Sequence, residues 1–353
     1  MEETVKARGI ILLSILLFMM VLAGCKQETT LPTNVEIGMQ EIEAGQYQKA
    51  LTTFGTAILE EQDLVNAYRG EGIAYMGLGN YDEAIISFDE AIARAEDKQG
   101  ELVKDIRYYK AATLYKTEDF TGTISVCDDI LAEDSEADAY YLRGTSYLEQ
   151  GEAEKAKIDF DIAVSQQPQD YDLYLNIYAS YLEKNLSAEG DLYLQKALEI
   201  DSKNKEDAYH KARIYYHLEN YEQAKTELTE LVGEQGEKAL LLMGKTYQAM
   251  EDYPHARNMY EQYILVHGET PTAYNGIALA DIGEENYDRA LGNIAKGLAL
   301  AENKGKQELY YNEIVAYEFK GDFQTAKEKA LTYRTSYVMD PLGKKEYDFL
   351  QNR

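Results

Sequence analysis

The sequence contains few of the residue types that brace small folds or bind metals. Among 353 residues there are no tryptophans, two cysteines, four histidines and five prolines. Cys25 lies in an amino-terminal segment with a separate role, so Cys127 has no expected disulfide partner and stability must come from packing. His210 and His217 are seven residues apart and could share a helix face, but no cysteine is near them in sequence. A zinc site needs three or four ligands, so we predict no metal site.

Positive charge is scarce as well. The chain has 35 Lys and Arg against 63 Asp and Glu, which gives a formal net charge of −28. Phosphate binding requires a concentrated basic face, and the absence of one argues against a nucleic-acid partner. An acidic surface prefers cationic or neutral partners. The simpler interpretation is that the excess Asp and Glu keep exposed helix faces solvated.

Motifs for catalysis and cofactor binding are also missing. The sequence has no phosphate-binding Gly-Lys-Ser/Thr loop, no His-Glu-x-x-His zinc pair, no nucleophile elbow and no calcium loop. Gly70 and Gly72 form a Gly-x-Gly pair, but they stand inside an expected helix without a preceding strand, so helix packing explains them better. Cys127 is expected to be a small buried apolar residue rather than a nucleophile. We predict that the protein is not an enzyme and needs no cofactor.

The first 25 residues resemble a bacterial lipoprotein leader. Lys6 and Arg8 precede an apolar run from 10 to 22, which has the form of a secretory signal. The run ends in Leu22-Ala23-Gly24-Cys25, which resembles the lipobox. The resemblance implies a signal peptide over 1–24, a lipid on Cys25, and a polar tether over 25–34. An uncleaved membrane anchor and a soluble secreted protein are the alternatives, although the run is short for a helix that spans about 30 Å.

From residue 35 onward apolar residues recur every three and four positions, which is the period of amphipathic helices. No strand alternation is visible. Small residues in motifs such as Tyr-Asp-Glu-Ala recur at intervals of 32 to 39 residues, most often 34. We call these residues the anchors and count other positions from them; they are Ala50, Ala84, Thr123, Ala156, Gly190, Ala224, Ala256, Ala290 and Ala326.

Other positions recur with the anchors. Position −12 is small in seven repeats, with Tyr178 and Ile314 as the exceptions, and aromatic residues predominate at −9 and −3. A 34-residue helix-turn-helix period with these positions resembles the tetratricopeptide repeat family. The resemblance implies an all-α, right-handed α-solenoid of about nine repeats over 35–340, with a capping helix at 341–353. Turn glycines are expected to end the first helix of the clearest repeats, and they are Gly45, Gly79, Gly151 and Gly321.

In this family the first helices line a concave groove, and positions −15, −11 and −8 usually point into it. The candidates for binding are Tyr108, Tyr115, Tyr141, Tyr209, Arg213 and Tyr216, with an acidic edge formed by Asp105, Asp138, Asp172 and Glu206. Such a face suits an extended segment that carries Lys or Arg, because tyrosine offers cation–π contacts and carboxylates attract cations. The alternative is that tyrosine is only the generic packing aromatic of this chain. Arg69, Arg213 and Lys245 are isolated cations at these positions, so a carboxylate clamp is not predicted.

These features favour a membrane-tethered protein-interaction scaffold, with a role in bacterial envelope assembly implied by similar lipoproteins. The partner is then a protein or peptide, for which a basic segment is one candidate, and the location is extracytoplasmic, with the cell membrane favoured over the outer membrane. The alternative function is a surface glycan or solute receptor, against which the absence of tryptophan counts.

Overall fold

The computed structural model describes residues 32–201, 205–234 and 236–352, and within these ranges every regular element is helical. The described elements are 19 α-helices and one short 3₁₀ helix. Helices α1 to α18 form nine consecutive hairpins, and α19 follows them. The predicted all-helical repeat array is therefore confirmed over this part of the chain. The predicted signal peptide and Cys25 lie outside the described residues.

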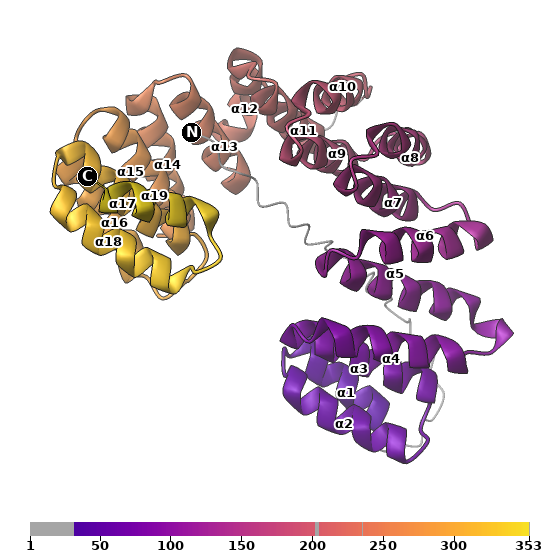
Figure 1. Cartoon of the computed structure of the whole chain (residues 1–353). Coiled ribbons are helices and arrows are strands. Elements are labelled where there is room, and N and C mark those ends of the chain that lie inside the picture. The colour runs from indigo at the N-terminus through magenta and orange to yellow at the C-terminus, as the bar shows by residue number, and fades with distance from the viewer. Residues whose placement is uncertain (1–31, 202–204, 235, 353) are drawn as a thin grey trace, which may run out of the picture. The chain divides into compact units, whose positions relative to one another are not determined.

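The chain divides into two compact units, Met1–Ala197 and Leu198–Arg353. In the first unit each hairpin packs on the next, and the first helices of successive hairpins (α1, α3, α5, α7 and α9) also contact one another (Figure 1). Its helices are α1 (Asn34–Glu43), α2 (Tyr47–Leu59), α3 (Leu64–Leu78), α4 (Tyr81–Arg94), α5 (Gly100–Lys116), α6 (Phe120–Glu133), α7 (Ala137–Glu149), α8 (Ala153–Gln166), α9 (Tyr171–Glu183) and α10 (Ser187–Leu198). The 3₁₀ helix η1 (Asp97–Gln99) precedes α5 and accounts for the long second interval between anchors.

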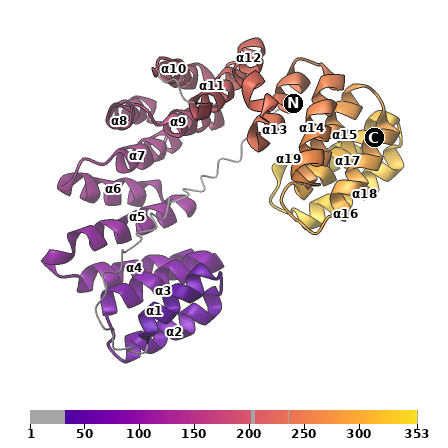
Figure 2. The ribbon, with the colours of Figure 1, turned by 180° about the vertical axis from the view of Figure 1, so that it is seen from behind.

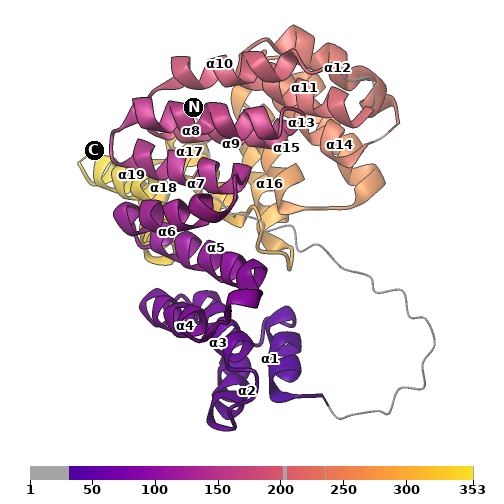
Figure 3. The same cartoon turned by 90° about the vertical axis from the view of Figure 1, so that its right-hand side faces the viewer.

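The second unit repeats the same arrangement with four further hairpins and a final helix (Figures 2 and 3). The first helices α11, α13, α15 and α17 again contact their neighbours, and α19 packs on α18. The helices are α11 (Lys205–His217), α12 (Tyr221–Gly233), α13 (Glu237–Ala249), α14 (Tyr253–His267), α15 (Pro271–Gly283), α16 (Tyr287–Ala299), α17 (Lys306–Lys320), α18 (Phe323–Ser336) and α19 (Pro341–Gln351). Prolines 254 and 271 occupy the first turns of α14 and α15, where no intrahelical donor is lost.

Small residues at −12 allow a large side chain at +4 to fill the space between helices. Phe54 of α2 has no exposed surface and lies between Gly38 of α1 and Gly70 of α3. A Cβ atom on Gly38 would lie 2.6 Å from Phe54 Cζ, and one on Gly70 would overlap the same ring. Cys127 holds position +4 in its repeat and is fully buried, which raises the pKa of its thiol to about 12. The prediction that it is a buried apolar residue is confirmed.

The turn between the two helices of each hairpin contains a left-handed residue at position −5. The four predicted glycines are confirmed, with φ between 69° and 85°. The sequence did not indicate that five other hairpins in the described residues place non-glycine residues in the same conformation; they are Glu118, Asn185, Glu219, Glu251 and Glu285. The position therefore requires a left-handed backbone whatever its side chain, at a cost of about 1–2 kcal/mol for an ordinary L-residue.

Replacing Glu251 with glycine is expected to raise the free energy of unfolding by about 0.5–1 kcal/mol. Glycine removes the left-handed strain, and its larger unfolded-state entropy offsets part of that gain. Urea denaturation followed by circular dichroism would measure the change. The matched control is Glu261→Gly, an exposed position inside α14, which is expected to lose about 1 kcal/mol. Equal losses in both variants would contradict the assignment of strain to the turn.

Candidate functional site

The tyrosine candidates of the first unit lie on neighbouring first helices. Tyr108 and Tyr115 are on α5 and Tyr141 is on α7, and all three side chains are half-buried. Tyr108 and Tyr115 pack against the core cluster that contains Ala111 and Cys127. Tyr141 Oη lies 3.5 Å from Ser180 Oγ of α9. These side chains therefore pack against the core and also keep part of their surface exposed.

The first helices α5, α7 and α9 contact one another in succession, and side chains from all three lie close to Tyr115. Burial raises the pKa of Tyr115 most, and the charge of Glu149 on α7, the Tyr141 hydroxyl and the charge of Glu183 on α9 raise it further. Lys184, just after α9, forms an ion pair with Glu149 across the same face. We call this surface of α3, α5, α7 and α9 the first-helix face of the first unit.

Tyr108 has a hydroxyl oxygen that is buried. Burial raises its pKa, and the charges of Glu136 and Asp138 raise it further. Tyr108 therefore lies beside the acidic edge that the sequence predicts. Its phenol stays protonated and can offer only neutral, apolar or cation–π contacts at physiological pH.

The acidic candidates differ in their surroundings. Asp105 accepts a hydrogen bond from Arg69 Nε at 2.5 Å, and Arg69 also lies over the Tyr109 ring at 5.3 Å. Asp105 thus approaches Arg69 from the next hairpin and neutralises it, a pairing that the sequence did not indicate. Asp138 and Asp172 are exposed in the first turns of α7 and α9. Burial raises the pKa of Asp138, and the neighbouring carboxylates Glu136 and Asp170 raise it further.

The remaining candidates belong to the second unit. Tyr209, Arg213 and Tyr216 are half-buried on α11, and the side chain of Glu206 lies outside those that the structure describes. The Tyr209 ring lies 5.9 Å from Arg213 Cζ and 6.0 Å from Lys238 Nζ. Both tyrosines pack against the core of α11, α12 and α13. Six of the ten candidates therefore lie in the first unit. The other four belong to the second unit, where the side chains of Tyr209, Arg213 and Tyr216 are described and that of Glu206 is not.

Apolar residues on the first-helix face were not among the candidates. Ile73 and Met76 of α3 and Leu182 of α9 occupy positions −11 or −8, and all three are half-buried. The register that selects Tyr115 also selects them, so the signal is present in the sequence. Aromatic character and charge, the criteria for the candidates, exclude these aliphatic side chains.

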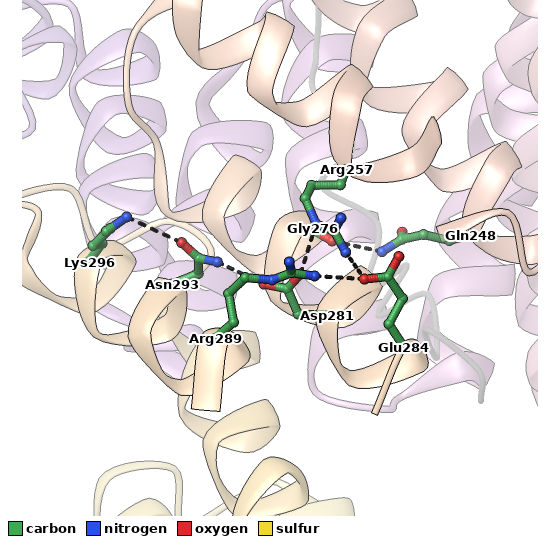
Figure 4. A network of polar contacts seen from close by, with 8 residues as sticks. All are labelled: Gln248, Arg257, Gly276, Asp281, Glu284, Arg289, Asn293 and Lys296. Atoms are coloured by element: carbon green, nitrogen blue, oxygen red, sulfur yellow. Dashed lines mark hydrogen bonds and ion pairs between the residues drawn. The ribbon is translucent and has the colours of Figure 1, made fainter. Parts of the chain in front are cut away.

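A buried ion network in the second unit was also missed (Figure 4). Asp281 of α15 has no exposed surface, and its Oδ1 accepts hydrogen bonds from Arg257 Nε of α14 and Arg289 Nε of α16, each at 2.8 Å. Asn293 Nδ2 donates to Asp281 Oδ2 at 2.8 Å, and both arginines also pair with Glu284. The network joins three successive helices.

The sequence does carry a signal for this network. Asp281 stands at position −9, where most repeats have tyrosine, with a cation at −1 and a hydrogen-bonding residue at +3. The first repeat has the same combination: Glu41 at −9 contacts Lys49 at −1 and Thr53 at +3, at 3.0 Å and 2.7 Å. In both repeats an acidic residue at position −9 is therefore accompanied by a cation at −1 and a hydrogen-bonding residue at +3.

Glu284 couples this network to pH. Burial acts to raise its pKa, but hydrogen bonds from Arg257 and Arg289 and their charges outweigh burial and lower the pKa below its usual value. A lowered carboxyl pKa stabilises the fold above the unfolded value of about 4.3. We expect this stabilisation to be lost as the pH falls through the lowered pKa of Glu284.

Two further features are absent from the described residues, namely a metal site and a membrane-spanning helix. They contain no group of three or more His, Cys, Asp or Glu side chains arranged to hold a metal ion. No helix in the described ranges is both long enough and apolar enough to cross a membrane.

Three hairpins match models of a known family. One tetratricopeptide repeat model matches residues 65–98, which contain α3 and α4. A second matches 137–170 and 208–235, which contain α7 with α8 and most of α11 with α12. The chain contains tetratricopeptide repeats. Stacked repeats of this kind build extended surfaces that suit protein interaction, and the matching models indicate no catalytic family.

Several solved structures are similar to the chain in fold. A tetratricopeptide repeat protein from Parabacteroides merdae has 15% identity and a TM-score of 0.48, over 72% of this chain and 98% of that one. MamA from Desulfovibrio magneticus RS-1 has 21% identity and a TM-score of 0.41, over 48% and 97%. YrrB, a repeat protein with an unusual peptide-binding site, has 20% identity and a TM-score of 0.39, over 48% and 84%. No curated protein matches the sequence.

Proposed function

We propose that this protein is an extracytoplasmic scaffold, tethered to a bacterial membrane by a lipid on Cys25, that binds a protein partner in envelope assembly. The observation that supports the binding role is the first-helix face of the first unit, where successive first helices contact one another and Tyr141 of α7 lies 3.5 Å from Ser180 of α9. A face built from several repeats suits an extended protein segment better than a small solute.

The membrane tether rests on the leader alone. Lys6, Arg8, the apolar run and the Leu22-Ala23-Gly24-Cys25 motif support it. Two or more acyl chains hold a protein on a membrane durably, whereas a single chain gives only marginal binding. Because the polar tether would place the repeats just outside the bilayer, the partner is expected at the membrane surface.

Replacing Cys25 with serine is expected to remove the lipid and leave the leader uncleaved, because serine cannot receive the thioether-linked lipid that the lipobox requires before cleavage. Mass spectrometry of the amino-terminal peptide would measure this, as loss of the lipid mass and retention of residues 1–24. The control is Cys127→Ala, which removes the other thiol and should keep the lipid and the cleaved amino terminus. An unaltered chain that carries no lipid and still begins with the leader would support the uncleaved anchor instead.

Partner binding is tested by crosslinking in membranes followed by quantitative co-purification. The variant Tyr108→Ala, Tyr115→Ala and Tyr141→Ala is expected to lose at least about 90% of a specific partner, since aromatic residues dominate interface energies. The control changes three half-buried tyrosines at the starts of second helices, Tyr47, Tyr81 and Tyr287, to alanine.

Both variants must first show unchanged helicity by circular dichroism. Equal loss of the partner in the two variants would mean that the tyrosines act only through packing. If no protein is enriched with the unaltered chain, the scaffold proposal fails, and a glycan or solute ligand becomes the hypothesis to pursue with a thermal-shift panel.

A further inference from the structure

We propose that the first-helix face of the first unit binds a segment whose apolar side chains lie along α3 to α9 and whose Lys or Arg side chain reaches the edge formed by Asp138 and Asp172. This inference rests on the proposed function and adds the chemistry of the partner.

The floor of the face is apolar and aromatic. At positions −15, −11 and −8 of the second to fifth repeats the half-buried side chains include Ile73, Met76, Tyr108, Tyr115, Tyr141 and Leu182. The charged and polar side chains at these positions already have partners within the chain. Arg69 pairs with Asp105, and the Thr145 hydroxyl donates to the carbonyl of Leu142. A partner that lies on this floor therefore gains by burying apolar area, at about 25 cal/mol per Å².

One edge of the same face is acidic. Asp138 is in the first turn of α7, and Asp170 caps α9 by accepting hydrogen bonds from the backbone of Asp172 and Leu173 at 2.9 and 3.1 Å. The nearby cation, Lys104, contacts Glu136 at 2.9 Å, and it also pairs with Glu101 and Asp134.

Lys104 thus faces three carboxylates, and Asp138 itself forms no ion pair with a described residue. The raised pKa of Asp138 reflects burial first and then repulsion from Glu136 and Asp170. An added cation relieves this repulsion, whereas an added anion increases it. With a net charge of −28, the chain attracts a cationic segment from a distance as well.

The combination of an apolar floor and an acidic edge selects one partner chemistry. A neutral apolar segment leaves the repulsion of Asp138 by Glu136 and Asp170 unrelieved, and a highly charged segment leaves the floor uncovered. A segment with apolar residues followed by Lys or Arg satisfies both, and Tyr108 beside the edge adds a ring for cation–π contact.

Three synthetic peptides test this proposal. They share one core of leucine and alanine and end in two Lys, two Gln or two Glu. Their affinities for the full-length chain in lipid nanodiscs are measured by fluorescence anisotropy at low salt. The Lys peptide is expected to bind about threefold to fivefold more tightly than the Gln peptide, as for partly exposed charge pairs, and the Glu peptide most weakly.

The preference should disappear in the variant Asp138→Asn with Asp172→Asn and persist in the control Asp129→Asn, an exposed carboxylate on α6. On acidification the preference for the Lys peptide should also be lost, and at a higher pH than the usual aspartate pKa of about 3.9 predicts. The reason is that the pKa of Asp138 is raised.

The two proposals fail in different ways. Equal affinity for the Lys and Gln peptides, or a preference that survives Asp138→Asn with Asp172→Asn, overturns the cationic edge while the scaffold stands. If none of the peptides binds but co-purification finds a tyrosine-dependent partner, the proposed partner chemistry is wrong. If co-purification also finds no partner, both proposals fall.

Discussion

Replacing Asp281 with alanine is expected to lower the free energy of unfolding of the second unit by about 3–5 kcal/mol, the cost of removing one partner from a buried ion network. Asp281 has no exposed surface and binds Arg257, Arg289 and Asn293 from the flanking helices. Without the Asp281 carboxylate, the guanidinium groups of Arg257 and Arg289 pair only with Glu284. Urea denaturation followed by circular dichroism measures the loss.

The matched control is Asp288→Ala on α16, whose exposed carboxylate pairs with Lys320 at 2.5 Å. Exposed ion pairs contribute little, so this variant should unfold close to the unaltered chain. Asp281→Asn keeps an acceptor for the arginines and should fall between the two. Losses of similar size for Asp281→Ala and Asp288→Ala would show that the network does not hold the three helices together.

Replacing Phe54 with alanine is expected to lower the free energy of unfolding of the first unit by about 3–5 kcal/mol, because it empties a fully buried space between α1 and α3. Gly70→Ala alone is expected to cost about 1–3 kcal/mol, since its methyl group would overlap the Phe54 ring. In the Phe54→Ala background the same Gly70→Ala change should stabilise by about 1 kcal/mol, because space is now available and alanine is the better helix former.

This reversal of sign is measured with a double-mutant cycle. Gly55→Ala on α2 is the control, because a Cβ atom there has no neighbour within 4 Å, and it should stabilise by about the same amount in both backgrounds. If Gly70→Ala stabilises the unaltered chain as much as Gly55→Ala does, the contact between Phe54 and Gly70 does not limit the approach of α1 and α3.

Most of the fold could be predicted because its determinants repeat within each 34-residue period. The sequence predicts that Cys127 is a small buried residue, and its full burial confirms this. The turn position −5 is predictable only where it is glycine. Glu118, Glu219, Glu251 and Glu285 adopt the same left-handed conformation, because packing of the two helices dictates the turn and overrides the residue preference.

The candidate site was less predictable. The pairing of Arg69 with Asp105, 36 residues later, was not predicted. The division of the tyrosines between two units was likewise not visible in the register. Whether those tyrosines bind a partner or only pack stays a prediction for the co-purification experiment, since ring burial of this degree suits both.

The helical period, the hairpin turns with glycine and the recurrence of small core residues follow from the sequence alone, because each depends on residues that lie within one repeat. The neutralisation of individual charges follows only from the folded structure. Asp281 and Asp138 are both acidic residues on first helices, but one is enclosed by two arginines and the other faces carboxylates. That difference arises from neighbours on adjacent helices, whose approach is set by packing in three dimensions.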